Sequence, residues 1–324
     1  MARVIGLDIG GTKCAALLAD VEEGINEEGI NIVEKIRFDT CAGLGFEYAR
    51  GKLFDAVNAL LAASSHPVSA IGISCGGPLN SRTGVIQSPP NLPGWDDIPL
   101  TDMLTAAFGL PAYLQNDANA CGLVEWKMGA GRGAENMVFL TMGTGMGAGI
   151  IAEGRLLRGA CDMAGEVGHM RLAADGPIGY GKAGSFEGFS SGGGIARLAA
   201  MLRSRWEEKG DAPAWTEAPG ELTAKVLADY ARSGDVHARK VFAEAGERLG
   251  EGIAILADVL NPEVVVIGGV YMRCEDLLSE AMWRAIRREA LAHTANGLRV
   301  LPAQTGENIG DYAAVMVAHY GLTE

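Results

Sequence analysis

The stretch Gly6-Leu7-Asp8-Ile9-Gly10-Gly11-Thr12-Lys13 decides the fold of this 324-residue chain. A carboxylate lies near the end of an apolar strand, and two glycines, a hydroxyl and an amine follow it. Glycines let backbone N–H groups approach phosphate oxygens, Thr12 can donate a hydrogen bond, and Lys13 can offset charge. The order predicts a β-hairpin turn that binds nucleotide phosphates, with Asp8 holding the hydrated Mg²⁺ that accompanies ATP. A tight Gly-Gly hairpin without a ligand is the alternative.

A second glycine cluster, Leu140–Gly149, again joins two apolar runs. Two such hairpins suit a phosphate chain held between two lobes, which makes Thr141, Gly143, Thr144 and Gly145 nucleotide candidates. The chain has no G-x-x-x-x-G-K-[ST] sequence, and the second cluster does not fit G-x-G-x-x-G. A Walker P-loop and a Rossmann dehydrogenase are therefore disfavoured.

The composition indicates a globular protein, with 48% hydrophobic and 21% charged residues, and the length favours two domains. The net charge of −13 argues against a nucleic-acid or anionic-membrane surface. Six cysteines are scattered without a C-x-x-C pair, which favours reduced thiols in a cytoplasmic protein. The sequence shows no charged-then-apolar leader and no apolar run of about 18 residues, so we expect no membrane association.

The spacing of apolar residues predicts an alternation of strands and helices. A proline-rich loop is expected over 88–95 and a polar surface loop over 207–220. The predicted strands are 4–7, 14–19, 32–37, 70–74, 113–114 and 264–267, and the predicted helices are 46–63, 117–128, 195–206, 222–232, 237–260 and 312–320.

Six motifs in order along the chain resemble the ROK family of sugar kinases and repressors. They are Asp8-Ile9-Gly10-Gly11-Thr12-Lys13, Gly72-Ile73-Ser74-Cys75-Gly76-Gly77-Pro78, Pro90-Asn91-Leu92-Pro93-Gly94-Trp95, Asn116-Asp117-Ala118-Asn119-Ala120, Gly143-Thr144-Gly145 and Ala164-Gly165-Glu166-Val167-Gly168-His169. The resemblance implies a two-lobed α/β fold of the actin-like, ribonuclease-H-like type. We expect one lobe from 1–117 with 306–324 and the other from 118–305, with assembly as a homodimer or homotetramer.

Phosphoryl transfer to a sugar needs a base for the hydroxyl proton, and Asp117 is the best candidate. It lies at an expected strand-to-helix junction, and the resemblance gives it this role, although a helix N-cap is the alternative. The resemblance also assigns sugar hydroxyls to Glu166, His169 and Glu187. Further sugar-binding candidates are Gly77, Asn91 and Asn116, and further nucleotide candidates are Gly192, Gly268 and Gly269.

The chain departs from the family in the segment after His169. Many members bind structural zinc there through the histidine and three cysteines, but this chain has Ile178, Tyr180 and Ser185 in their places. That set does not make the four-coordinate N/S site that zinc prefers, so we expect no zinc. We expect His169 to be oriented by hydrogen bonding to the Tyr180 or Ser185 hydroxyl, or to the glycine-rich backbone.

The combined reading predicts an ATP- and Mg²⁺-dependent hexose kinase, acting on the 6-hydroxyl of glucose. An N-acetylmannosamine or N-acetylglucosamine kinase is the nearest alternative. A sugar-sensing regulator is the alternative of another class, but only seven residues precede Asp8, which leaves no visible helix-turn-helix. A catalytically silent sugar-binding protein is disfavoured by Asp117 and the two glycine hairpins.

Overall fold

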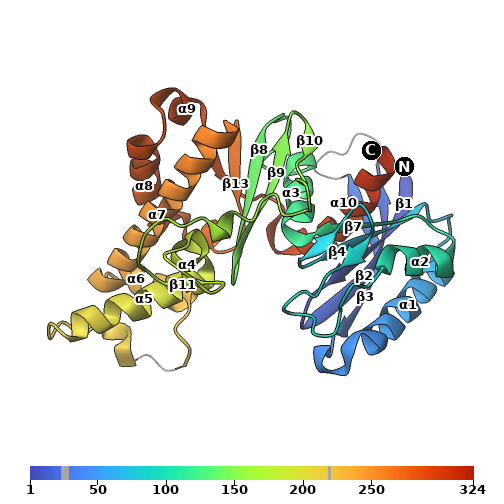
Figure 1. Ribbon diagram of the computed structural model, residues 1–324, viewed down its shortest axis with the longest axis horizontal. Coiled ribbons are helices and arrows are strands. Elements are labelled where there is room, and N and C mark those ends of the chain that lie inside the picture. Colours follow the sequence, from blue (N-terminus) through green and yellow to red (C-terminus); the bar gives the residue numbers. More distant parts are fainter. Residues whose placement is uncertain (23–28, 218–219) are drawn as a thin grey trace. The chain divides into compact units, whose positions relative to one another are not determined.

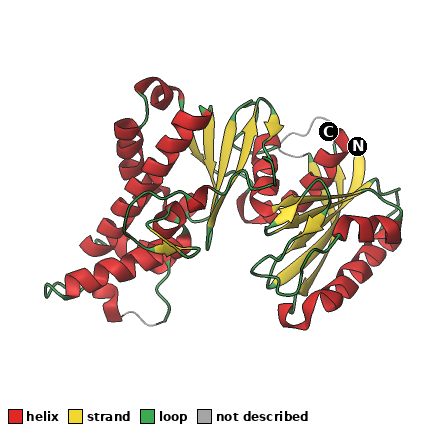
Figure 2. Ribbon diagram, viewed as in Figure 1, coloured by secondary structure: helices red, strands yellow, loops and turns green. Residues whose placement is uncertain are grey.

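The computed structural model describes residues 1–22, 29–217 and 220–324, which form two compact units (Figures 1 and 2). The first unit comprises Met1–Gly133, Leu156–Ala164 and Gln304–Glu324, and the second comprises Ala134–Arg155 and Gly165–Ala303. The first unit extends past the expected boundary at residue 117, because helix α3 (Asp117–Lys127) packs on α10 (Ile309–Thr323). That the two parts act as lobes stays a prediction.

The first unit contains a five-stranded sheet in the order β3-β2-β1-β4-β7. Strands β1 (Ala2–Ile9), β2 (Lys13–Val21) and β3 (Ile30–Asp39) are antiparallel neighbours. Strands β4 (Ala70–Cys75) and β7 (Ala112–Asn116) run parallel to β1. The interior strand β4, between β1 and β7, is buried at every residue, as a strand covered on both faces must be.

Helices cover both faces of this sheet. Helix α1 (Gly45–Ala63) and α2 (Leu100–Phe108) contribute Phe46, Leu53 and Leu104 to one core with the sheet. On the other face, α10 packs so closely that a Cβ on Gly72 would lie 2.3 Å from the Ala314 carbonyl oxygen. Only glycine permits this approach of helix to sheet.

Short elements complete the first unit. A small hairpin consists of β5 (Leu79–Asn80) and β6 (Val85–Ile86). The 3-10 turns are η1 (Ala42–Leu44) and η4 (Gly306–Asn308). The buried Glu125 of α3 accepts hydrogen bonds from the backbone of Ala130, Gln304 and Thr305, which ties α3 to the segment that enters α10.

The second unit contains a sheet in the order β10-β9-β8-β13-β14. Its largest helix pair, α7 (Val236–Leu260) and α8 (Tyr271–Glu289), packs through small residues, since a Cβ on Gly250 would lie 2.2 Å from the Met282 carbonyl oxygen. The sheet strands are β8 (Met137–Met142), β9 (Met146–Ala152), β10 (Arg155–Leu156), β13 (Val264–Ile267) and β14 (Arg299–Pro302). The other elements are η2 (Val167–His169), β11 (Ile178–Gly179), β12 (Lys182–Ala183), α4 (Phe186–Ser190), α5 (Gly192–Glu207), η3 (Ala214–Glu217), α6 (Ala224–Arg232) and α9 (Ala292–Gly297).

The structure confirms all the predicted strands and helices, with ends that differ by a few residues. The polar segment 207–220 contains η3, and residues 218–219 lie outside the described residues. The sequence reading missed α2 and α8, although Leu278, Met282 and Ile286 of α8 recur at helical spacing. Within the described ranges, no helix combines the length and the apolar character that crossing a bilayer requires.

Candidate functional site

In the first unit, three parallel strands end at one edge of the sheet. Ile9 pairs with Cys75, and Cys75 pairs with Asn116. Asp8 therefore lies at the carboxyl end of β1, and Asp117 follows the carboxyl end of β7. In open α/β sheets this edge is the usual place for ligands.

The sequence left open whether Asp117 is a helix cap or a free carboxylate, and the structure gives the cap to Asn116. Asn116 is the N-cap of α3, and its Oδ1 accepts from the backbone N–H of Ala118 at 2.9 Å and of Asn119 at 3.5 Å. Asp117 occupies the first helical turn, and its side chain is exposed. Desolvation by the surrounding protein raises the pKa of Asp117, while hydrogen bonds from the backbone N–H of Ala118 and its own N–H oppose the shift. Asp117 is therefore an exposed carboxylate with an increased tendency to accept a proton.

The turn between β1 and β2 has the predicted hairpin geometry. The Gly10 N–H donates to the Lys13 carbonyl oxygen at 3.1 Å. Thr12 and Lys13 are exposed, so their side chains are open to a ligand. Buried Thr40 fixes the turn, because its hydroxyl donates to the Gly10 carbonyl at 2.6 Å and its N–H to the Thr12 carbonyl at 2.9 Å. The sequence reading missed Thr40, which is distant along the chain.

Asn91 joins this turn to the end of β4. A Cβ on Gly11 would lie 2.6 Å from the Asn91 carbonyl oxygen, and one on Gly76 would lie 3.4 Å from the Asn91 Nδ2. A Cβ on Gly77 would lie 3.1 Å from the Asn116 Nδ2. The first unit thus brings together the phosphate-turn candidates and four sugar candidates. These four, Gly77, Asn91, Asn116 and Asp117, we call the strand-end group.

Asp8 lies in a crowded electrostatic environment. Burial, and then repulsion from Asp311 and Asp117, raise its pKa to about 6, while Lys35 and Arg37 oppose this shift. Asp311, in the first turn of α10, forms an ion pair with Lys35 and lies 3.8 Å from Arg37. Sequence reasoning missed this group, because β3 and α10 are at opposite ends of the chain.

In the second unit, the hairpin of β8 and β9 gathers the remaining glycine candidates. The Gly192 N–H donates to the Gly143 carbonyl at 2.8 Å, and the Gly268 N–H donates to the Leu140 carbonyl at 2.9 Å. Gly269 has φ +69°, and a Cβ there would lie 2.3 Å from the Met142 carbonyl oxygen. Close packing therefore requires glycine at Gly192 and Gly269, and Gly268 is buried.

Around the same hairpin, Thr144 is exposed and Thr141 and Gly145 are partly buried. The N-terminus of α5 lies beside it, since a Cβ on Gly193 would lie 2.7 Å from the Thr144 carbonyl oxygen and 3.1 Å from the Arg197 guanidinium. Arg197 is an exposed cation at this position that the sequence reading missed. Arg197 is one helical turn after Gly193, and this spacing could have placed it beside the glycine candidates from the sequence.

Glu166, His169 and Glu187 form a second set, which we call the loop group. Glu166 precedes η2, which ends at His169. A Cβ on Gly168 would lie 3.2 Å from the Glu187 Cβ, so the histidine loop and α4 are in contact. The Glu187 Oε2 accepts from the Met146 N–H at 3.0 Å, directly after Gly145. Glu187 therefore connects the loop group to the glycine hairpin.

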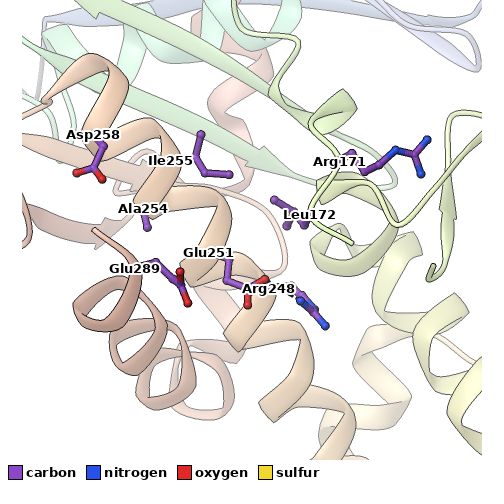
Figure 3. A pocket seen from close by; sticks show the side chains of 8 residues that line it. All are labelled: Arg171, Leu172, Arg248, Glu251, Ala254, Ile255, Asp258 and Glu289. Atoms are coloured by element: carbon purple, nitrogen blue, oxygen red, sulfur yellow. Dashed lines mark hydrogen bonds and ion pairs between the residues drawn. The ribbon is translucent and has the colours of Figure 1, made fainter. Parts of the chain in front are cut away.

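A hollow of about 320 Å³ lies elsewhere on the second unit, along α7 (Figure 3). Among its charged side chains, Arg248 pairs with Glu251 at 2.8 Å. None of the predicted site residues lines it. The lining residues are Arg171, Leu172, Arg248, Glu251, Ala254, Ile255, Asp258 and Glu289.

The sequence matches the ROK family over residues 4–320. The chain belongs to the ROK family. It is 35% identical over 312 residues to a glucokinase from Halalkalibacterium halodurans, and the match covers 94% of this chain and 92% of that protein. A ROK hexokinase from Thermus thermophilus superposes with a TM-score of 0.79 at 30% identity, covering 99% of each chain.

A ROK family glucokinase from Streptomyces griseus, in complex with glucose and AMPPNP, superposes with a TM-score of 0.76. It is 31% identical, and the match covers 99% of this chain and 100% of that one. These neighbours have the actin-like ATPase fold, so the predicted fold class of this ROK protein is confirmed.

Proposed function

We propose that this ROK protein is an ATP:hexose phosphotransferase that phosphorylates the 6-hydroxyl of glucose. The observation that carries the proposal is the exposed Asp117 carboxylate at the strand edge that also bears the phosphate turn. Similarity to glucokinases over nearly the whole chain supports glucose as the first substrate to test. Phosphoryl transfer depends mainly on positioning and charge stabilisation, for which such an edge is suited.

In the proposed reaction, the sugar hydroxyl attacks the γ-phosphorus of ATP. A bond forms between O6 and phosphorus, the bond to the β–γ bridging oxygen breaks, and the hydroxyl proton passes to Asp117. The raised pKa of Asp117 supports this role, because it makes the carboxylate a better proton acceptor. The strand-end group and the loop group would bind the sugar hydroxyls.

The phosphates would contact the backbone N–H groups at Gly10–Thr12 and at Gly143–Gly145, with Thr141 and Lys13 nearby. Gly192, Gly268 and Gly269 would lie along the nucleotide, and we add Arg197 to these candidates. The donor set at Asp8, a single partly buried carboxylate, suits contact through water with Mg²⁺. The metal would neutralise phosphate charge.

An N-acetylhexosamine kinase is the second candidate, since neither group of residues distinguishes one hexose from another. We propose no nucleic-acid or membrane partner, in keeping with the net charge of −13. A homodimer or homotetramer and a cytoplasmic location are also part of the proposal. All six cysteines are free thiols, which supports a reducing compartment.

A coupled assay of ADP release tests this function across glucose, mannose, N-acetylglucosamine and N-acetylmannosamine, with ATP and Mg²⁺. We expect the largest kcat/KM for glucose and product bearing phosphate on O6, which NMR of the product identifies. A preference for an N-acetylhexosamine would favour the second candidate. Sugar binding by calorimetry without turnover would contradict the kinase and indicate a sensor.

A further inference from the structure

The segment that follows His169 is held together by its own backbone. The Phe186 N–H donates to the Met170 carbonyl at 2.8 Å, and the Leu172 N–H donates to the Gly184 carbonyl at 2.9 Å. The Gly184 N–H donates to the Pro177 carbonyl at 3.1 Å. These bonds close a compact loop that returns the chain to His169, and the short hairpin of β11 and β12 projects from it.

The tip of this hairpin carries an unusual residue. Tyr180 has φ +43° and Gly181 has φ +76°, so both occupy the left-handed region of a two-residue turn. Glycine and asparagine are the residues that favour this conformation, and a tyrosine there is strained. Its side chain is nevertheless 67% exposed, so burial of the ring does not account for it.

The Tyr180 ring contacts His169. The two ring centroids are 5.1 Å apart with an interplanar angle of 76°, the edge-on geometry that aromatic pairs prefer. From the same hairpin, the Lys182 ammonium donates to the His169 carbonyl oxygen at 2.5 Å. One hairpin thus contacts both the side chain and the backbone of the histidine.

Ser185, the other expected partner of His169, caps helix α4 instead. Its hydroxyl accepts from the Gly188 N–H at 3.1 Å as the N-cap of α4. The same hydroxyl donates to the Gly179 carbonyl at 3.5 Å, so neither of its two hydrogen bonds reaches His169, against the expectation that it orients the histidine. Structural zinc would need thiolate or imidazole ligands, which Ile178, Tyr180 and Ser185 do not supply.

We propose that Tyr180 and Lys182 are positioning residues that fix the orientation of the His169 imidazole for sugar binding. The ring of Tyr180 restricts rotation of the imidazole, and Lys182 holds the backbone from which it projects. The proposal rests on the proposed function, in which His169 binds a sugar hydroxyl. An aromatic contact of this kind predicts a change of roughly 2- to 10-fold in sugar affinity when the ring is removed.

The experiment compares Tyr180→Ala with Tyr180→Phe and measures kcat and both KM values. For Tyr180→Ala we expect KM for glucose to rise about 2- to 10-fold, with KM for ATP unchanged. Tyr180→Phe should match the wild type, because it keeps the ring and removes only the hydroxyl. Tyr48→Ala, which removes a partly exposed tyrosine of α1 in the other unit, is the matched control.

Lys182→Met should raise KM for glucose in the same direction, and Lys182→Arg should restore it. The His169 ring protons, followed by NMR, should shift in Tyr180→Ala and remain in place in Tyr180→Phe, because the aromatic ring current is lost only in the first. Dialysis against EDTA, with Mg²⁺ then restored, should leave KM for glucose unchanged.

Four results would overturn the proposal. In Tyr180→Ala, an unchanged KM for glucose, or an equal rise in both KM values, would remove the positioning role. Equal effects of the alanine and phenylalanine variants would assign the role to the hydroxyl instead. A rise in KM after EDTA would show that a metal holds the loop. If the wild type turns over no sugar, the proposed function fails, but the His169 ring-proton shift still decides whether Tyr180 holds the imidazole.

Discussion

In the first unit, Asp8 lies near the end of β1 and Asp117 directly follows β7, and a five-stranded sheet fixes the register of both strands. In the second unit, His169 ends a 3-10 turn and Glu187 lies in a short helix. The strand-end group is supported by buried packing, including the approach of α10 to Gly72. The loop group is supported by local hydrogen bonds over 170–187.

The two groups differ in how closely the placement of their side chains depends on the stability of the fold. Helix α10 and the sheet leave no space between them. A change in packing there should therefore lower the stability of the unit and also displace the Asp8 and Asp117 carboxylates. Around the loop group, a change acts on the placement of one or two side chains. We therefore expect effects on turnover and stability in the first unit and effects on KM in the second.

The largest effect should come from Asp117→Asn. Removal of a general base lowers the rate by on the order of 10²–10⁴-fold, and we expect kcat to fall in this range while glucose still binds. Stopped assays give kcat, and calorimetry gives the glucose affinity. Asp102→Asn, at another first helical turn of the same unit, is the control and should keep wild-type turnover. Turnover near the wild-type value in Asp117→Asn would show that another group accepts the proton.

Gly72→Ala should reduce the stability of the first unit. The added Cβ would lie 2.3 Å from both the Ala314 carbonyl oxygen and the Ala318 nitrogen, which are backbone atoms of α10. Overpacking of this kind destabilises by about 1–3 kcal/mol, measured by denaturant unfolding. Gly51→Ala on α1, where a Cβ meets no atom within 4 Å, is the control and should stabilise by up to about 1 kcal/mol. Similar losses in both variants would refute the close-packing argument.

The pH dependence tests the electrostatics of Asp8. Its pKa in the folded protein, about 6, is above the ordinary value of 3.8, so the folded state binds a proton that the unfolded state has released between these values. The contribution of Asp8 to stability is therefore fully present below about pH 3.8 and is lost as the pH rises through about 6. Activity should change in the opposite direction if Asp8 acts as proposed, because only its ionised form would hold hydrated Mg²⁺.

Asp8→Asn should accordingly raise the unfolding free energy at pH 8, by on the order of 1–3 kcal/mol, and lower activity. Thermal unfolding at pH 5 and pH 8 gives the first quantity, and a profile of kcat/KM against pH gives the second. Asp20→Asn should have the opposite sign, since Arg3 lowers the pKa of Asp20. A wild-type activity profile that is flat through pH 6 would be inconsistent with an ionised Asp8 at the metal.

Gly143→Ala should give the smallest of these effects and one confined to the nucleotide. A Cβ there would meet only the Thr141 hydroxyl, at 3.9 Å, so the fold has space for it. If backbone approach to phosphate is the reason for this glycine, KM for ATP should rise by about tenfold with unchanged melting temperature. Gly145→Ala is the contrasting variant, because its Cβ would lie 2.7 Å from the Glu187 Oε2 and should disturb sugar binding as well.

Particular residues show how far the sequence could lead. Asp117 and Asn116 were predicted together because a strand end and a helix cap have local signatures. Thr40, Lys35 and Asp311 were missed, since each acts on Gly10 or Asp8 only after distant strands pair and α10 packs on the sheet. Tyr180 was named, but as a hydrogen-bonding hydroxyl, and the structure gives a ring contact instead.

The sequence by itself determined the two glycine hairpins, many of the strands and helices and the family, because these depend on short-range patterns of glycine, charge and apolar spacing. Only the tertiary structure decided the raised pKa of Asp8, the tie from Glu125 to the start of α10 and the contact of Tyr180 with His169. Each of these depends on the distance and solvent exclusion between residues that are separated along the chain, and no local pattern specifies either.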